Sequence, residues 1–221
     1  MKKVFCLSVI LIALVFSNCT TNKTAQKPKE VAFAKGGDVG WLPQMEATGY
    51  EFYDTDGTQK DCLQLLKDRG MNTIRLRVWV NPSDDKASGH CSKEETVAMA
   101  VRAQKMGMRI MIDFHYSDSW ADPGKQNKPA AWKNHTFAEL LNDVYLHTED
   151  VLKALKQAGV TPEWVQVGNE IPGGMLWPEG STDNFNQLAQ LLNKGYDATK
   201  AVDKNIKVIV HLDEGNNSKK F

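Results

Sequence analysis

The sequence is poor in cysteine and carries no excess of either charge. Four cysteines occur among its 221 residues, none at the spacing of a metal site, and the spacing of Cys62 and Cys91 allows a disulfide without requiring one. Lysine and arginine together number 27, equal to aspartate and glutamate, and the body of the chain has no basic run. Nucleic acid is therefore excluded as the main partner, and no metal or cofactor is expected.

Long apolar runs are also missing, apart from one at the N-terminus. That run, Val4–Phe16, follows two lysines and is too short to cross a bilayer comfortably. With the next three residues it resembles a bacterial lipoprotein signal that places Cys19 at the lipidated position; an ordinary secretory signal is the alternative. We expect residues 1–18 to be a signal peptide, residues 19–30 to be a flexible tether, and the protein to be exported, either anchored to a membrane surface through Cys19 or secreted.

From Val31 onward, short apolar strands alternate with amphipathic helices. Strands are expected to begin near Val31, Asn72, Met108, Glu163 and Ile206. Helices are expected over Thr58–Arg69, after the capping boxes Ser92/Glu95 and Thr136/Glu139, and over Asn184–Val202. This alternation predicts a parallel sheet, either doubly wound or closed into a barrel. Because no glycine-rich nucleotide-binding loop follows the first strand, the barrel is favoured.

Charged and aromatic residues gather where the expected strands end. They are Gly36–Asp38 and Trp41 after the first strand; Arg75, Arg77 and Trp79 on the second; Asp113, His115, Tyr116, Asp118 and Trp120 on and after the third; Asn169, Glu170 and Trp177 after the fourth; and His211, Asp213 and Glu214 after the fifth. Active sites of parallel α/β folds lie at this end of the sheet. Most of the tryptophans fall there, and an indole at a surface is well covered by a sugar ring. Carbohydrate is therefore the expected substrate class.

Several of these residues also have a purely structural interpretation. Glu170 is able to cap the turn after its strand, and Arg75 and Arg77, which face the same side of one strand, are able to form structural ion pairs. His115 suits a hydrogen-bonded core, and Trp79 suits packing under its own loop. The residues alone leave these alternatives open.

Four segments, taken in order, resemble one known family. They are Asn72–Pro82, Asp113–Pro123, Gly168–Ile171 and His211–Gly215. Together they are similar to the arabinogalactan endo-β-1,4-galactanases of glycoside hydrolase family 53, and the resemblance runs from about Gly36 to the end of the chain. It implies a (β/α)8 TIM barrel that cleaves β-1,4-galactan internally with retention of configuration.

The resemblance also implies a division of roles. Glu170 is the acid/base at the end of the fourth strand, and a second glutamate at the end of a seventh strand is the nucleophile; retaining enzymes place these carboxyl groups about 5–5.5 Å apart. Asn169 bonds the sugar 2-hydroxyl, and Arg75 keeps the nucleophile ionised. His115 and Tyr116 line the subsite of the cleaved bond, whereas neighbouring sugars contact a set of residues that we expect to be Asp118, Trp120, Trp177 and Asp213.

The expected strands are too few for a complete barrel, and two hypotheses account for the difference. Residues 31–221 hold five expected strands, whereas a (β/α)8 barrel has eight and takes about 250 residues. We expect a barrel truncated after the fifth strand that lacks its nucleophile. The chain is then either the N-terminal part of a galactanase or an inactive surface lipoprotein that binds galactan. In neither case is the 221-residue chain itself expected to cleave the polymer.

Overall fold

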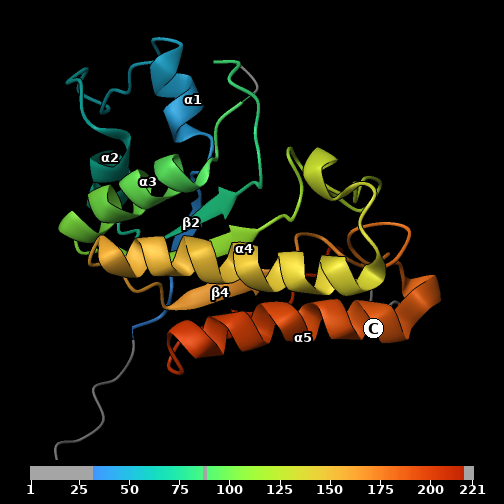
Figure 1. Ribbon diagram of the computed structural model, residues 1–221. Helices are drawn as coiled ribbons and strands as arrows, with labels where there is room; N and C mark the ends of the chain where they lie inside the picture. Colours follow the sequence, from blue (N-terminus) through green and yellow to red (C-terminus); the bar gives the residue numbers. More distant parts are fainter. Residues whose placement is uncertain (1–31, 87–88, 217–221) are drawn as a thin grey trace, which may run out of the picture. The chain divides into compact units, whose positions relative to one another are not determined.

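The structure is a computed structural model that describes residues 32–86 and 89–216 (Figure 1). The predicted signal peptide, the tether and Cys19 lie outside the described residues. A compact unit begins at Ala34. In the described part of the chain, no helix has both the length and the apolar character needed to cross a membrane.

Five parallel strands form one sheet in which the spatial order equals the chain order. The strands are β1 (Gly36–Asp38), β2 (Thr73–Val78), β3 (Arg109–Phe114), β4 (Trp164–Val167) and β5 (Lys207–Ile209). The predicted starts of β2 to β5 are confirmed to within one residue. The first is wrong, because Gly36–Asp38, expected to follow a strand, is the strand itself. A side chain at Gly36 would stand 2.0 Å from the Thr73 carbonyl oxygen, so glycine lets β1 come close to β2.

Helices connect successive strands. They are α1 (Leu42–Ala47), α2 (Cys62–Asp68), α3 (Lys93–Lys105), α4 (Phe137–Gln157) and α5 (Phe185–Val202), with short 3₁₀ turns at Ala130–Trp132 and Thr182–Asn184. Both predicted capping boxes are present at the starts of α3 and α4. Helix α1 was not expected from the sequence; it begins after Trp41 with a proline in its first turn, where the missing N–H is not needed.

The two faces of the sheet differ in polarity because successive side chains point to opposite sides. The face that points toward the helices carries buried apolar side chains. They are Ile74, Leu76, Val78, Ile110, Ile112, Phe114, Val165 and Val167. Figure 1 shows α3, α4 and α5 over this face, with α4 and α5 side by side. The opposite face carries Asp38, Arg75, Arg77, Asp113 and Gln166. The core therefore lies between sheet and helices, and the polar residues lie on the side that faces a barrel interior.

Both cysteines of this unit are free thiols. Cys62 and Cys91 are buried and form no disulfide with each other, which settles the alternative that the sequence left open. The Cys91 thiol donates to the Gly40 carbonyl oxygen at 3.2 Å. Burial raises the pKa of Cys91 to about 11, so this thiol is poorly reactive at neutral pH.

Gly195 sets how closely α5 packs against β4. A methyl group at this position would lie 2.6 Å from Val167 Cγ1 and 2.9 Å from the Tyr116 hydroxyl oxygen. Glycine within a helix costs about 1 kcal/mol relative to alanine. The close contact between helix and sheet offsets that cost.

We predict that Gly195→Ala lowers the free energy of unfolding by about 1–2 kcal/mol, because overpacking of about 1–3 kcal/mol exceeds the gain in helix propensity. Urea denaturation followed by circular dichroism measures the change. Asn193→Ala, on the exposed side of the same helix, is the control and is expected to stay within about 0.5 kcal/mol. Equal or higher stability of Gly195→Ala would contradict this packing.

An ion-pair cluster joins three strands at their amino-terminal ends. Glu163 accepts hydrogen bonds from Arg109 Nε at 2.6 Å and from Lys207 Nζ at 2.9 Å. Arg109, and then Lys207, hold the pKa of the Glu163 carboxyl at about 2, below its ordinary 4.5. Glu163 therefore binds its proton more weakly in the folded state than in the unfolded state.

The depressed pKa of Glu163 predicts a specific loss of stability in acid. Its contribution is complete above pH 4.5 and disappears as the pH falls toward about 2, where the folded carboxylate also takes up a proton. The difference in unfolding free energy between the wild type and Glu163→Gln should therefore shrink across this window. Denaturation curves at a series of pH values measure it, with Glu149→Gln on α4 as a control. A difference that is constant with pH would contradict the assignment.

Candidate active site at the carboxyl ends of the strands

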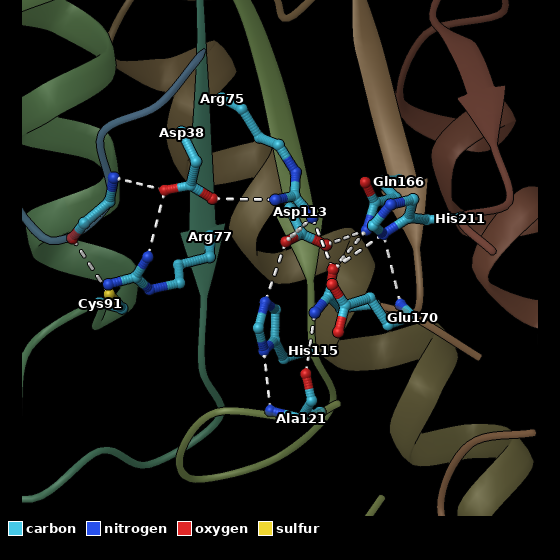
Figure 2. Close-up of polar contacts among 12 residues, drawn as sticks. Asp38, Arg75, Arg77, Cys91, Asp113, His115, Ala121, Gln166, Glu170 and His211 are labelled. Atoms are coloured by element: carbon cyan, nitrogen blue, oxygen red, sulfur yellow. Dashed lines mark hydrogen bonds and ion pairs between the residues drawn. The ribbon is translucent and has the colours of Figure 1, made fainter. Parts of the chain in front are cut away.

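The register of the sheet brings polar side chains from four strands together. Asp38 on β1 is paired with Arg75 on β2, and Arg77 is aligned with Asp113 on β3 and Gln166 on β4. Figure 2 shows Arg75 and Gln166 directed to Asp113, and Asp38 placed between Arg75 and Arg77. Residues up to 128 positions apart in sequence thereby form one connected network (Gln166 minus Asp38).

Asp113 is the centre of this network and has no exposed surface. One carboxylate oxygen accepts from Arg75 Nη2 at 2.6 Å and from His115 Nε2 at 2.9 Å. The other accepts from Gln166 Nε2 at 2.5 Å. A buried carboxylate is stable only when several donors surround it, and these three donors come from β2, β4 and the end of β3.

Asp38 joins the two arginines of β2. Its two carboxylate oxygens accept from Arg75 Nη1 at 3.0 Å and from Arg77 Nη1 at 3.1 Å. The ion-pair interpretation of both arginines is therefore confirmed. Arg77 also places its guanidinium 4.6 Å from the centre of the Trp120 ring. Arg75 also has a buried Nε without a hydrogen-bond partner among the described residues.

The chain turns sharply after β4, and this turn presents Asn169 and Glu170. Gly168 and Glu170 both have positive φ, +80° and +48°, and a residue other than glycine in this region is strained. Gln126, on the loop after β3, holds the turn by donating to the carbonyl oxygens of Asn169 at 2.8 Å and Glu170 at 3.1 Å. The Glu170 N–H points to His211 Nδ1 at 3.3 Å.

Asn169 belongs to the buried network, whereas Glu170 does not. The Asn169 side-chain oxygen accepts from Arg75 at 2.6 Å, and its amide donates to the Ala121 carbonyl oxygen at 2.8 Å. Its contact with a sugar hydroxyl stays a prediction that would use the second amide hydrogen. The Glu170 carboxylate is half-buried and has no hydrogen-bond or ion-pair partner within the described residues. It is therefore available to a ligand.

His115 is buried rather than exposed to a substrate. It is 1% exposed, its Nδ1 accepts the Ala121 N–H at 3.1 Å, and its Nε2 therefore carries the proton that is donated to Asp113. Both ring nitrogens are therefore engaged. The prediction that His115 lines the subsite of the cleaved bond is wrong in this arrangement, and its alternative as a hydrogen-bonded core histidine holds. Its role is to position Asp113.

Tyr116 also does not reach the site, which corrects the prediction that it lines the same subsite. The side chain is 1% exposed and stacks on Phe114, with ring centres 5.6 Å apart. Its hydroxyl contacts Thr148 Oγ1 on α4 at 2.7 Å, and burial raises its pKa above the ordinary value. Its contacts with Phe114 and with α4 therefore place Tyr116 on the side of the sheet that packs against the helices.

The remaining predicted residues lie on the loops around Glu170. Asp118 accepts backbone N–H groups of Asn81 at 3.0 Å and Ala130 at 2.8 Å, so it fastens two loops. Trp120 is 38% exposed beside Arg77, and Trp79 is buried, as its packing interpretation requires. The proposed sugar contacts are untested predictions for Asp118, Trp120, Trp177 and Asp213.

Gln126 and Gln166 were not expected in the site from the sequence, and Asp38 and His211 were expected at strand ends but without their partners. Gln166 carries a recognisable signal, because a polar residue between Val165 and Val167 on a buried strand requires a partner on the far face. Asp38 shares that signal once β1 is placed correctly. Gln126 carries none, since its partners depend on how two loops meet.

Comparison with known proteins identifies the relationship. Residues 34–221 match the family model described as glycosyl hydrolase family 53. The chain belongs to this family. It is 38% identical to an endo-beta-1,4-galactanase of Bacillus subtilis over 81% of this chain and 42% of that protein. More generally, this family 53 chain spans about half the length of the curated relatives it matches.

Solved structures agree with this membership. A family 53 catalytic domain from Ignisphaera aggregans is 41% identical, with a TM-score of 0.77 over 81% of this chain and 51% of that chain. One of two fungal beta-1,4-galactanases is 35% identical, with a TM-score of 0.78 over 85% of this chain and 55% of that chain. The predicted (β/α)8 fold class is confirmed, with five of its strands in the described part of this family 53 chain.

We predict that Asp113→Asn lowers the free energy of unfolding by about 3 kcal/mol, because the amide removes the charge that compensates the partly buried Arg75. Chemical denaturation measures the loss. Asp183→Asn, at an exposed position near the start of α5, is expected to change stability by less than about 0.5 kcal/mol. If both variants were equally stable, Asp113 would not be the centre of the network.

Proposed function

We propose that this chain carries the acid/base half of a retaining endo-β-1,4-galactanase active site, with Glu170 as the proton donor and acceptor. The observation that carries the proposal is the free Glu170 carboxylate at the carboxyl end of β4, on a turn whose backbone is held from outside by Gln126. Membership of glycosyl hydrolase family 53 and the galactanase relatives support galactan as the substrate.

The chemistry divides between two carboxyl groups. In the first step Glu170 would protonate the glycosidic oxygen as a nucleophilic carboxylate attacks the anomeric carbon, and in the second it would deprotonate the water that releases the sugar. The nucleophile is assigned to no described residue. The fixed positive charge of Arg75, whose side chain is partly exposed, supports a role for this arginine in keeping that carboxylate ionised.

The buried network would serve this chemistry by fixing the position of Asn169. The Asn169 side-chain oxygen accepts from Arg75, and its amide nitrogen donates to the Ala121 carbonyl oxygen. The side chain is therefore already ordered before substrate binds. Preorganisation of this kind lowers the barrier because no reorientation is needed in the transition state. Asn169 would then donate its second amide hydrogen to the 2-hydroxyl.

The alternative function is galactan binding without cleavage, and the exposed Trp120 is compatible with both. We also propose export, with anchoring to a membrane surface through Cys19. That part of the proposal rests on the N-terminal sequence alone.

Glu170→Gln, in the complete protein that carries these residues, is expected to lower the rate on β-1,4-galactan by about 10²- to 10⁴-fold, because the leaving oxygen then receives no proton. An aryl galactoside with a good leaving group needs no protonation and should keep its first step. Reducing-end release and the aryl burst are the two measurements. Glu149→Gln on α4 controls for loss of a surface carboxylate, and an unchanged galactan rate in Glu170→Gln would assign the acid elsewhere.

A further inference from the structure

His211, just beyond β5, contacts three successive residues of the turn after β4. Its carbonyl oxygen accepts the Ile171 N–H at 3.1 Å. Its ring nitrogen Nδ1 lies 3.3 Å from the Glu170 backbone nitrogen, a contact drawn in Figure 2, and 3.0 Å from the Asn169 side-chain oxygen. A single side chain at the end of the fifth strand therefore borders both residues to which the proposed chemistry gives a role.

The two partners of this nitrogen need different forms of the ring. The Glu170 N–H needs a lone pair on Nδ1, whereas the Asn169 oxygen needs a proton there. Reversing the Asn169 amide does not remove the conflict. Its oxygen faces the Arg75 guanidinium at 2.6 Å, and its nitrogen faces the Ala121 carbonyl oxygen at 2.8 Å. Nδ1 therefore serves one of its two partners at a time.

The other contacts of the two partners decide which one is served when the ring carries a single proton. The Asn169 oxygen already accepts from Arg75 at 2.6 Å and from Gln166 Nε2 at 3.3 Å. The Glu170 N–H has no other acceptor among the described residues, and a backbone N–H without an acceptor costs free energy. Nδ1 therefore accepts from Glu170, and the single ring proton lies on Nε2.

We infer that His211 positions the Asn169–Glu170 pair, and that a second ring proton transfers its support from Glu170 to Asn169. A ring with protons on both nitrogens has no lone pair for the Glu170 N–H, and its Nδ1–H donates to the Asn169 oxygen. The Glu170 backbone then keeps only its support from Gln126. The inference rests on the proposed function for the catalytic role of Glu170, whereas the contact itself does not.

The charged groups around this contact come from several elements. Arg75 on β2 bonds the same Asn169 oxygen and is paired with Asp113 on β3. Glu170 lies on the turn after β4, and Asp213 and Glu214 follow His211 in its own segment. Neighbouring groups titrate together, so the midpoint of the ring belongs to the whole group. The sharpest test therefore compares two midpoints in one sample.

An NMR titration of the 221-residue chain tests the contact directly. The backbone amide of residue 170 is expected to shift with the same midpoint as the His211 ring protons, and its protection factor against hydrogen exchange should fall as the ring takes up the second proton. The shift should persist in Glu170→Gln, in which residue 170 has no titrating carboxyl group. An amide that does not follow the His211 midpoint overturns the inference.

Two variants show that the shift comes from this ring. His211→Asn keeps a polar group near the Nδ1 position but does not titrate, so the Glu170 amide should lose the shift. His135→Gln is the matched control, because His135 bonds Asp143 at 2.6 Å, and it should leave the Glu170 titration unchanged. A shift that survives in His211→Asn would assign it to another group and overturn the inference.

In the complete protein, His211→Ala is expected to lower kcat on β-1,4-galactan by about tenfold and to leave KM within about twofold, because a displaced acid slows proton transfer without removing a sugar contact. His211→Asn should recover most of the loss. Thermal unfolding checks that each variant folds, and if His211→Ala does not, the kcat of His211→Asn and the wild-type titration decide. An unchanged kcat in folded His211→Ala overturns the positioning role.

Failure of this inference and failure of the proposed function give different results. A protein whose galactan rate falls in Glu170→Gln but not in His211→Ala has the proposed acid without support from His211. A chain whose residue 170 amide follows the His211 ring, in a protein whose galactan rate is unaffected by Glu170→Gln, has the contact with a different acid.

Discussion

The buried charge of Asp113 is the constraint on which the rest of the site depends. A carboxylate without solvent must be surrounded by donors, and its donors come from β2, β4 and the residue that follows β3. The contacts from Arg75 on β2 and Gln166 on β4 form only when neighbouring strands are paired in register. The site is therefore a product of the assembled sheet: Arg75, once held by Asp113 and Asp38, in turn fixes the side-chain oxygen of Asn169.

Local signals in the sequence predicted the elements well and the side-chain partners poorly. Capping boxes located α3 and α4 because each is complete within four residues, and apolar runs located β2 to β5. β1 was misplaced because its two glycines and one aspartate have low strand propensity, and pairing with β2 overrides that preference. The prediction put Tyr116 on the substrate side of the sheet because it lies in a run of polar and aromatic residues after β3. Its contacts with Phe114 and with Thr148 on α4 place it against the helices, and these contacts depend on a left-handed backbone at Tyr116 that the sequence does not signal.

The buried network and the Glu170 carboxylate have opposite surroundings. Asp113, His115 and Asn169 are held by contacts that leave little of them accessible, whereas Glu170 has its backbone restrained and its carboxylate unengaged. The left-handed backbone at Glu170 separates the two, since it turns the chain away from the strand immediately after Asn169. Glu170 is thus held through its main chain, and its side chain stays without a partner within the described residues.

Gln126 ties the loop after β3 to the turn after β4, which limits how either can change in length. One side chain on the loop after β3 bonds two successive carbonyl groups of the turn after β4, while its own carbonyl binds the backbone of Trp177. An insertion or deletion between β3 and Gln126 would move the support of both Glu170 and Trp177. A change of length in either loop is therefore expected to move the Glu170 turn, because Gln126, the Asn127–Trp177 bridge and the Lys128–Glu179 ion pair all depend on how the two loops meet.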